Sequence, residues 1–151
     1  MKVLATIPFA KREWSVPSIN HDDPNWMGFY FEEFVIDWSI YPENSVGILY
    51  VETQDCDIPA SADGVNPPIR QGGWLRVAYQ YVPHQMIPIP GSEIETYVKT
   101  PARWQLLESK KFPIPHTPGV ACVWIEGKPK PGREVVLALA TIVIFAPEDG
   151  E

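Results

Sequence analysis

The sequence contains little cysteine and little histidine: its 151 residues include two cysteines and three histidines. Structural zinc sites need several such residues a few positions apart, and neither Cys56 nor Cys122 has a neighbour of this kind. Two cysteines are also too few for a disulfide-dense scaffold. We expect no metal site, a buried free thiol at Cys122 and a more exposed thiol at Cys56, and we leave open whether the two pair.

The sequence also lacks the short motifs of known reactions, since it has no HExxH, GxSxG or P-loop pattern. The run NHDDPNW joins His21 to two aspartates, but adjacent residues of an extended chain point in opposite directions. We interpret this run as a turn, and Glu32 and Glu33 face apart for the same reason. We therefore predict that the protein is not an enzyme and has no catalytic residue and no cofactor. A small jelly-roll enzyme with His84 or His116 in a barrel mouth stays as a lesser alternative.

Basic residues are fewer than acidic ones, 12 against 19, and the formal net charge is −7. An acidic surface repels phosphate backbones, so we do not expect nucleic acid as a partner. Lys128, Lys130 and Arg133 are the nearest approach to a basic cluster, and we interpret them as a solvated turn. No apolar run reaches the roughly 20 residues of a membrane helix, and Pro8 interrupts the apolar start. We expect no membrane partner, no secretion signal and synthesis in the cytoplasm.

Proline is the residue type that the sequence has in excess. The chain contains 17 prolines, whereas average usage near 5% would give about eight. Each proline removes a backbone N–H donor and restricts the residue before it, which argues against long helices. The length is that of one domain of roughly 100–200 residues. We expect strands joined by stiff loops.

The closing run, residues 133–145, is almost free of polar groups. Its valines and isoleucines are β-branched, which favours a strand over a helix. We predict one long strand, buried on both faces and central in a sheet.

Alternation of apolar and polar residues, and in residues 45–54 the β-branched and aromatic content, predicts further strands. In residues 28–40 we expect Phe34, Ile36, Trp38 and Ile40 to share one face, with a bulge at the two glutamates before them. Other strands are predicted at residues 45–54, 74–82, 92–100, 102–109 and 120–127, with an edge strand at 3–9. Asp55–Gly73 is predicted to be an irregular loop of nineteen residues.

These signals give about eight strands, no convincing helix and frequent turns. We predict an all-β protein, an antiparallel β-sandwich or jelly roll with long proline-rich loops. Residues 1–27 are expected to form an extended N-terminal arm, and residues 28–151 the β-sandwich domain.

The segments GILYVETQDCD, ADGVN, WLRVAYQYV and TPARWQLLES resemble the β-sandwich modules of bacteriophage virions, over Val46–Ser109. In those modules a strand like LYVE leads into a DG loop, and a later strand carries ARY-type residues. The long proline loops and the first 45 residues depart from that pattern. The resemblance implies a virion protein of capsid decoration (cement) or fibre type, which binds other virion proteins and acts as a homo-oligomer.

Residues at loop edges and in the long loop are the candidate partner contacts. We expect the contacts at Trp14, Trp26, Trp74, Asp57, Asp63 and Arg70. Trp38, Trp104 and Trp124 fall in strand patterns and are expected in the core. A carbohydrate-binding module, with tryptophans stacked on sugar rings, stays as the alternative. The aspartates of the long loop lack EF-hand spacing, although a looser calcium loop stays open.

Overall fold

The computed structural model describes residues 1–10, 14–17, 26–28, 34–80, 87–98, 103–115 and 120–147. Within these ranges the regular structure is all strand, apart from the single 3-10 turn η1 (Trp38–Ile40). The predicted all-β class with antiparallel sheets is therefore confirmed, and the arrangement is consistent with a β-sandwich. The strands are β1 (Val3–Ala10), β2 (Trp14–Pro17), β3 (Met27–Gly28), β4 (Phe34–Asp37), β5 (Val46–Thr53), β6 (Cys56–Ile58), β7 (Ile69–Gln71), β8 (Gly73–Gln80), β9 (Ile87–Pro88), β10 (Ile94–Glu95), β11 (Gln105–Glu108), β12 (Phe112–Pro113), β13 (Val120–Pro129), β14 (Glu134–Leu137) and β15 (Leu139–Phe145).

The first sheet has the order β1-β15-β5-β11, and the short strand β12 also pairs with β5. All its pairs are antiparallel. β15 lies between β1 and β5, so the prediction that the closing run supplies a central strand is correct. Among the described strands β1 pairs with β15 alone, as expected for an edge strand at residues 3–9.

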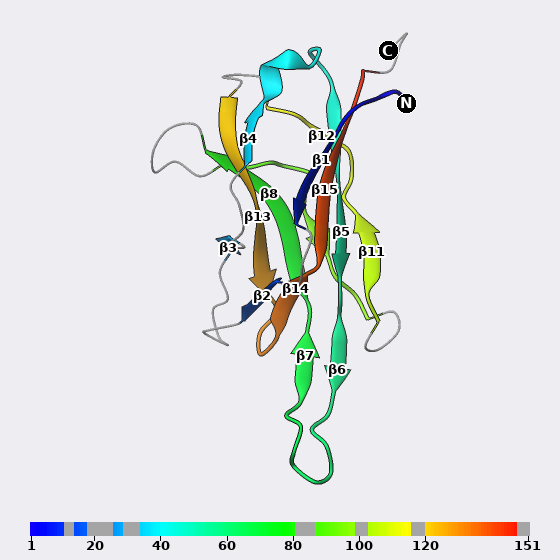
Figure 1. Ribbon diagram of the computed structural model, residues 1–151, viewed down its shortest axis with the longest axis vertical. Coiled ribbons are helices and arrows are strands. Elements are labelled where there is room, and N and C mark those ends of the chain that lie inside the picture. The colour runs from blue at the N-terminus through cyan, green and yellow to red at the C-terminus, as the bar shows by residue number, and fades with distance from the viewer. Residues whose placement is uncertain are drawn as a thin grey trace.

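The second sheet has β8 and β13 at its centre. These two strands pair antiparallel from Cys122↔Gln80 to Pro129↔Gly73, and β3, β4, β9 and β10 add short pairs at the sides. Figure 1 shows this sheet as a layer beside the first one, with both running along the long axis of the molecule.

The core lies between the two layers. Alternate residues of the central strands point inward, and their side chains form one cluster of buried residues. The first sheet contributes Leu49, Val51, Ile142 and Ile144, and the second contributes Leu75, Val77, Val123 and Ile125; every one is fully buried. Burying a side chain of this size stabilises the fold by about 1.5–3 kcal/mol.

The closing run differs from its prediction in two respects. It is two strands rather than one, because the chain bends at Ala138, whose N–H donates to the carbonyl of Glu52 at 2.9 Å. β15 pairs within the first sheet, whereas β14 belongs to a third sheet with the order β2-β14-β7-β6. Buried and half-buried residues alternate along β15, so only one of its faces is fully buried. The run therefore connects two sheets.

The expected number of about eight strands is lower than the fifteen segments of the structure, of which six have only two or three residues. Such short segments carry no readable alternation. Ile36 and Trp38 are buried as predicted, but Ile40 is 70% exposed, because η1 breaks the period-two pattern after Asp37. The predicted bulge at Glu32–Glu33 lies outside the described residues.

The described parts of the predicted N-terminal arm pair with the C-terminal strands. β1 pairs with β15, and β2 pairs with β14 from Trp14↔Leu137 to Pro17↔Glu134. Both pairs are antiparallel. These contacts place residues 3–10 and 14–17 in the sheets of the body.

Candidate functional site

The feature of the fold that stands apart from the body is a hairpin made by β6 and β7. The strands pair antiparallel as Cys56↔Gln71, Asp57↔Arg70 and Ile58↔Ile69, and residues 59–68 connect them. Figure 1 shows the hairpin projecting along the long axis, at the end opposite to both termini. The prediction of an irregular loop over Asp55–Gly73 is therefore wrong. The two strands of the hairpin were not predicted because each has only three residues.

The tip of the hairpin is held in one shape by its own hydrogen bonds. The Asp63 carboxylate accepts from the hydroxyl of Ser61 at 2.5 Å and from the N–H of Val65 at 3.0 Å. These hydrogen bonds lower the pKa of Asp63, and the bond from the Ser61 hydroxyl has the largest effect. The N–H of Asn66 donates to the Ser61 hydroxyl at 2.9 Å, and Gly64 supplies the positive φ of 75° that the turn requires. The tip is thus ordered although it is exposed.

The surface of the hairpin combines proline with exposed apolar side chains. Val65 is 73% exposed and Ile69 is 42% exposed. Pro59, Pro67 and Pro68 flank the tip, and each fixes its own φ. A loop with few accessible conformations loses little entropy when it binds a partner.

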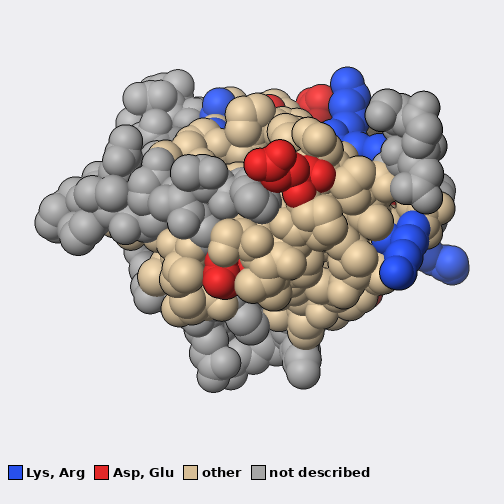
Figure 2. All heavy atoms as spheres, turned by 90° about the horizontal axis from the view of Figure 1, so that it is seen from above, with Lys and Arg blue, Asp and Glu red and all other residues tan. Residues whose placement is uncertain are grey.

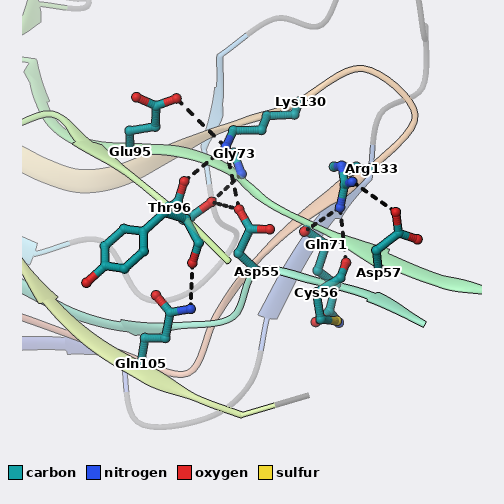
Figure 3. Close-up of polar contacts among 11 residues, drawn as sticks. Asp55, Cys56, Asp57, Gln71, Gly73, Glu95, Thr96, Gln105, Lys130 and Arg133 are labelled. Atoms are coloured by element: carbon teal, nitrogen blue, oxygen red, sulfur yellow. Dashed lines mark hydrogen bonds and ion pairs between the residues drawn. The ribbon is translucent and has the colours of Figure 1, made fainter. Parts of the chain in front are cut away.

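A network of buried polar groups fixes the base of the hairpin to the body (Figure 3). The Asp55 carboxylate, with a side chain 3% exposed, accepts from the Thr96 hydroxyl at 2.8 Å and lies 3.5 Å from the Lys130 ammonium. Lys130 also donates to the carbonyl of Thr96 at 2.9 Å. The N–H of Gly73 donates to the Thr96 hydroxyl at 2.8 Å. Segments far apart in the chain are thereby tied at one point.

Arg133 clamps the two strands of the hairpin from the side. Its Nη1 donates to the carbonyls of Cys56 and Gln71, both at 3.1 Å, and its Nη2 lies 3.3 Å from a carboxylate oxygen of Asp57. Its side chain and that of Lys130 are only 25% and 26% exposed. The interpretation of Lys128, Lys130 and Arg133 as a merely solvated turn is therefore wrong for the latter two. Their partners come from distant segments, which the spacing of the three residues did not indicate.

Within the described residues neither cysteine forms a disulfide, and their burial is the reverse of the prediction. Cys56 is fully buried, and its thiol lies 3.2 Å from the side-chain oxygen of Gln71 across the hairpin. Cys122 is half-buried, because it lies on the face of β13 opposite to the core. The polar residues around Cys56 suggested exposure, but they belong to the packed base of the hairpin.

A pocket of about 400 Å³ lies beside this base, lined in part by Asp55, Glu95, Tyr97 and Lys130. The Lys130 ammonium already has three oxygen partners, since Glu95 lies 3.8 Å from it in addition to Asp55 and Thr96. In the described ranges no group of three or more His, Cys, Asp or Glu side chains is arranged to hold a metal ion. All three histidines lie outside those ranges. The polar groups around the pocket serve to join the hairpin to the body.

The structure brings three of the six predicted contact residues together. Asp57 and Arg70 form a cross-strand ion pair at 3.8 Å, with both side chains more than half exposed, and Asp63 lies at the tip. Trp26 and Trp74 lie elsewhere, and both are half-buried. Trp14 is a residue of β2 whose side chain is outside the description.

The outer face of the second sheet carries the other tryptophans. On this face Trp74 lies opposite Lys128, and Trp124 lies opposite Ala78. Neither tryptophan is a core residue, so the prediction that Trp124 belongs to the core is wrong. Lys128 lies 5.3 Å from the ring of Trp74. Arg76 lies 3.9 Å from the ring of Trp26 and pairs with the buried Glu126 at 2.9 Å. Trp38 is buried as predicted, whereas Trp104 is 38% exposed because it precedes an edge strand.

The described surface shows no dominant charge at the end that carries the termini. Figure 2 shows an acidic group near the middle of this end and separate basic side chains near its rim. No helix within the described ranges is both long and apolar enough to cross a bilayer.

The fold and the site together define an all-β protein of facing antiparallel sheets with a rigid projecting hairpin. Comparison with protein-family models, with curated proteins and with solved structures gave no match to the chain. The residues that fix the hairpin, Asp55, Thr96, Lys130 and Arg133, were absent from the predicted site.

Proposed function

We propose that the protein is a non-enzymatic structural protein that docks on other protein chains through the β6–β7 hairpin. More specifically, we propose a β-sandwich of the virion decoration type, which binds a capsid shell and stabilises it. The contact role is supported by the hairpin, and the virion role by the resemblance of Val46–Ser109 to phage β-sandwich modules.

The observation that carries the contact role is an exposed but ordered tip. Val65 is 73% exposed at the end of a hairpin whose base is fixed by Arg133 and Lys130. An exposed apolar side chain on a rigid projection can enter a pocket of a partner without first becoming ordered. Asp57 and Arg70, on the strands of the same hairpin, supply charges that can set the orientation of docking.

Co-sedimentation with capsid shells of candidate phages tests the proposal. The variant Val65→Asp places a charge in the proposed contact, and we expect it to lose most of its binding. Val120→Asp is the matched control, because Val120 is 56% exposed on β13 of the body. Binding that Val65→Asp leaves unchanged, or a wild-type protein that binds none of the shells, would refute docking through the hairpin.

A carbohydrate-binding module is the second candidate, and it is favoured by the tryptophans outside the core. Trp74 and Trp124 share the outer face of the second sheet, and Trp26 contacts Arg76 of the same face. Aromatic rings on one sheet face can stack on sugar rings. A glycan array with Trp74→Ala and Trp26→Ala distinguishes the two candidates, since binding that neither change affects removes these residues from a glycan site.

A further inference from the structure

The edge strand β11 is the second surface of interest, because it lacks the prolines and register shifts found on several other edges. It pairs with β5 alone, and no other described strand borders it. It contains no proline, and its four residues pair in unbroken register from Gln105↔Thr53 to Glu108↔Tyr50. Figure 1 shows β11 at the outer side of its layer.

Other edge strands carry features that prevent further pairing. β1, at the opposite edge of the same sheet, has two register shifts along its length. Proline cannot donate to a neighbouring strand, and bulges turn an edge away from one. Prolines occur in four edge strands: Pro8 in β1, Pro17 in β2, Pro88 in β9 and Pro113 in β12. β11 has neither a proline nor a register shift, so neither feature prevents its edge from pairing.

The direction of the backbone groups shows which residues are free to pair. The N–H of Ser109 donates to the carbonyl of Leu49 in β5 at 2.8 Å. Backbone groups alternate in direction along an antiparallel strand, so those of Leu107 and Gln105 also point toward β5. The N–H and C=O groups of Leu106 and Glu108 therefore point away from β5, toward the open edge.

The side chains at this edge are apolar at the centre. Leu106 is 70% exposed and Trp104, of the same parity, is 38% exposed. An unpaired strand that exposes apolar side chains adds a strand from another chain readily.

We propose that β11 pairs antiparallel with β11 of a second copy of this chain, about a two-fold axis at Leu106. In this register the two Leu106 residues exchange hydrogen bonds with each other, and Glu108 of each copy lies opposite Trp104 of the other. The Glu108 carboxylates of the two copies are thereby kept apart. The register centred on Glu108 would place two carboxylates opposite each other. The register centred on Leu107, a non-hydrogen-bonded pair, would place the apolar Leu106 of each copy opposite the carboxylate of Glu108, whereas the register centred on Leu106 pairs two apolar side chains.

The dimer is independent of the hairpin, since β11 belongs to the first sheet and the hairpin to the third. Loss of shell binding by Val65→Asp would leave the dimer intact. Loss of the dimer would leave the hairpin ordered. The two proposals therefore fail separately.

Light scattering on a sizing column, over a range of protein concentrations, tests the dimer. We expect a mass twice the 17.1 kDa of the chain for the wild type. Leu106→Lys should raise the dissociation constant by more than about ten-fold, because two lysines would face each other on the axis. Val35→Lys is the matched control: Val35 is 68% exposed on β4, an edge strand of the other sheet, and its change should leave the dimer intact.

Two further measurements address the register. A mixture of Leu106→Lys and Leu106→Glu should recover a heterodimer although each variant alone is monomeric, because opposite charges then meet on the axis. Amide exchange of Leu106 and Glu108 should slow as the protein concentration rises, while the Leu107 amide, which bonds to β5, stays protected throughout. A monomeric wild type, or a dimer that Leu106→Lys leaves unchanged, would overturn the proposal.

Discussion

Replacing Lys130 by methionine probes the polar network at the base of the hairpin. The change keeps most of the side-chain volume but removes the ammonium group that faces the carboxylate of Asp55. The side chain of Asp55 is 3% exposed, and its carboxylate keeps the hydrogen bond from the hydroxyl of Thr96. Removing one member of a fully buried ion pair costs about 3–5 kcal/mol. The Lys130 side chain is 26% exposed and the pair is separated by 3.5 Å, so solvent screens part of the attraction.

We therefore expect Lys130→Met to lower the free energy of unfolding by about 2 kcal/mol. At about 2–4 °C per kcal/mol for a chain of this size, the melting temperature should fall by about 4–8 °C. Urea unfolding of the wild type, Lys130→Met, Asp55→Asn and the double variant gives the coupling between the two residues.

The coupling decides whether the network acts as argued. Asp55→Asn removes the charge that Lys130 faces, so the double variant should be more stable than the sum of the single losses implies, by about 1 kcal/mol. Two results would show that the ion pair does not hold the base of the hairpin. In the first, the free energy of unfolding of Lys130→Met lies within about 0.5 kcal/mol of the wild-type value; in the second, the losses of the two single variants add in the double variant.

Two further predictions concern a close backbone approach and a titrating carboxylate. Gly73→Ala should lower the free energy of unfolding by about 3 kcal/mol in urea, because its Cβ would lie 2.3 Å from the carbonyl oxygen of Lys128. Gly28→Ala is the control, since its Cβ meets nothing closer than 3.5 Å, and equal losses in the two variants would contradict the steric argument. The hydrogen bonds that lower the pKa of Asp63 require its charged form, so they persist at neutral pH and are lost as the pH falls through the native pKa. An NMR titration of the Val65 amide should give a midpoint below the ordinary 3.8, and a midpoint above it would contradict this account of the tip.

The long central strands could be predicted from the sequence, because their periodicity is a local property. In β8, Leu75 and Val77 alternate with Trp74 and Arg76, and the structure buries the first pair more deeply than the second. β5 was predicted from its β-branched and aromatic content, which is also a local property, and the predicted strand at residues 120–127 corresponds to β13. Period-two alternation survives wherever one face of a strand packs on a core.

The hairpin and its base were missed because their contacts are not local. Lys130 lies 75 positions from Asp55 and 34 from Thr96, and no spacing rule joins such residues. The sequence signal that could have indicated the packed base of the hairpin was the adjacent pair of glycines, Gly72 and Gly73. A Cβ on Gly72 would come within 2.6 Å of the Asp55 carboxylate, so glycine there marks a close approach between segments.

The position of the hairpin between β5 and β8 gives the molecule a route for mechanical load. β6 follows β5 and β7 precedes β8 along the chain, and β5 is bonded along its length to β15, which begins at the bend after β14. The hairpin and β15 run along the same long axis in Figure 1. A pull on the tip would therefore stress the central hydrogen bonds in shear, where many must break together, rather than peel them open one after another.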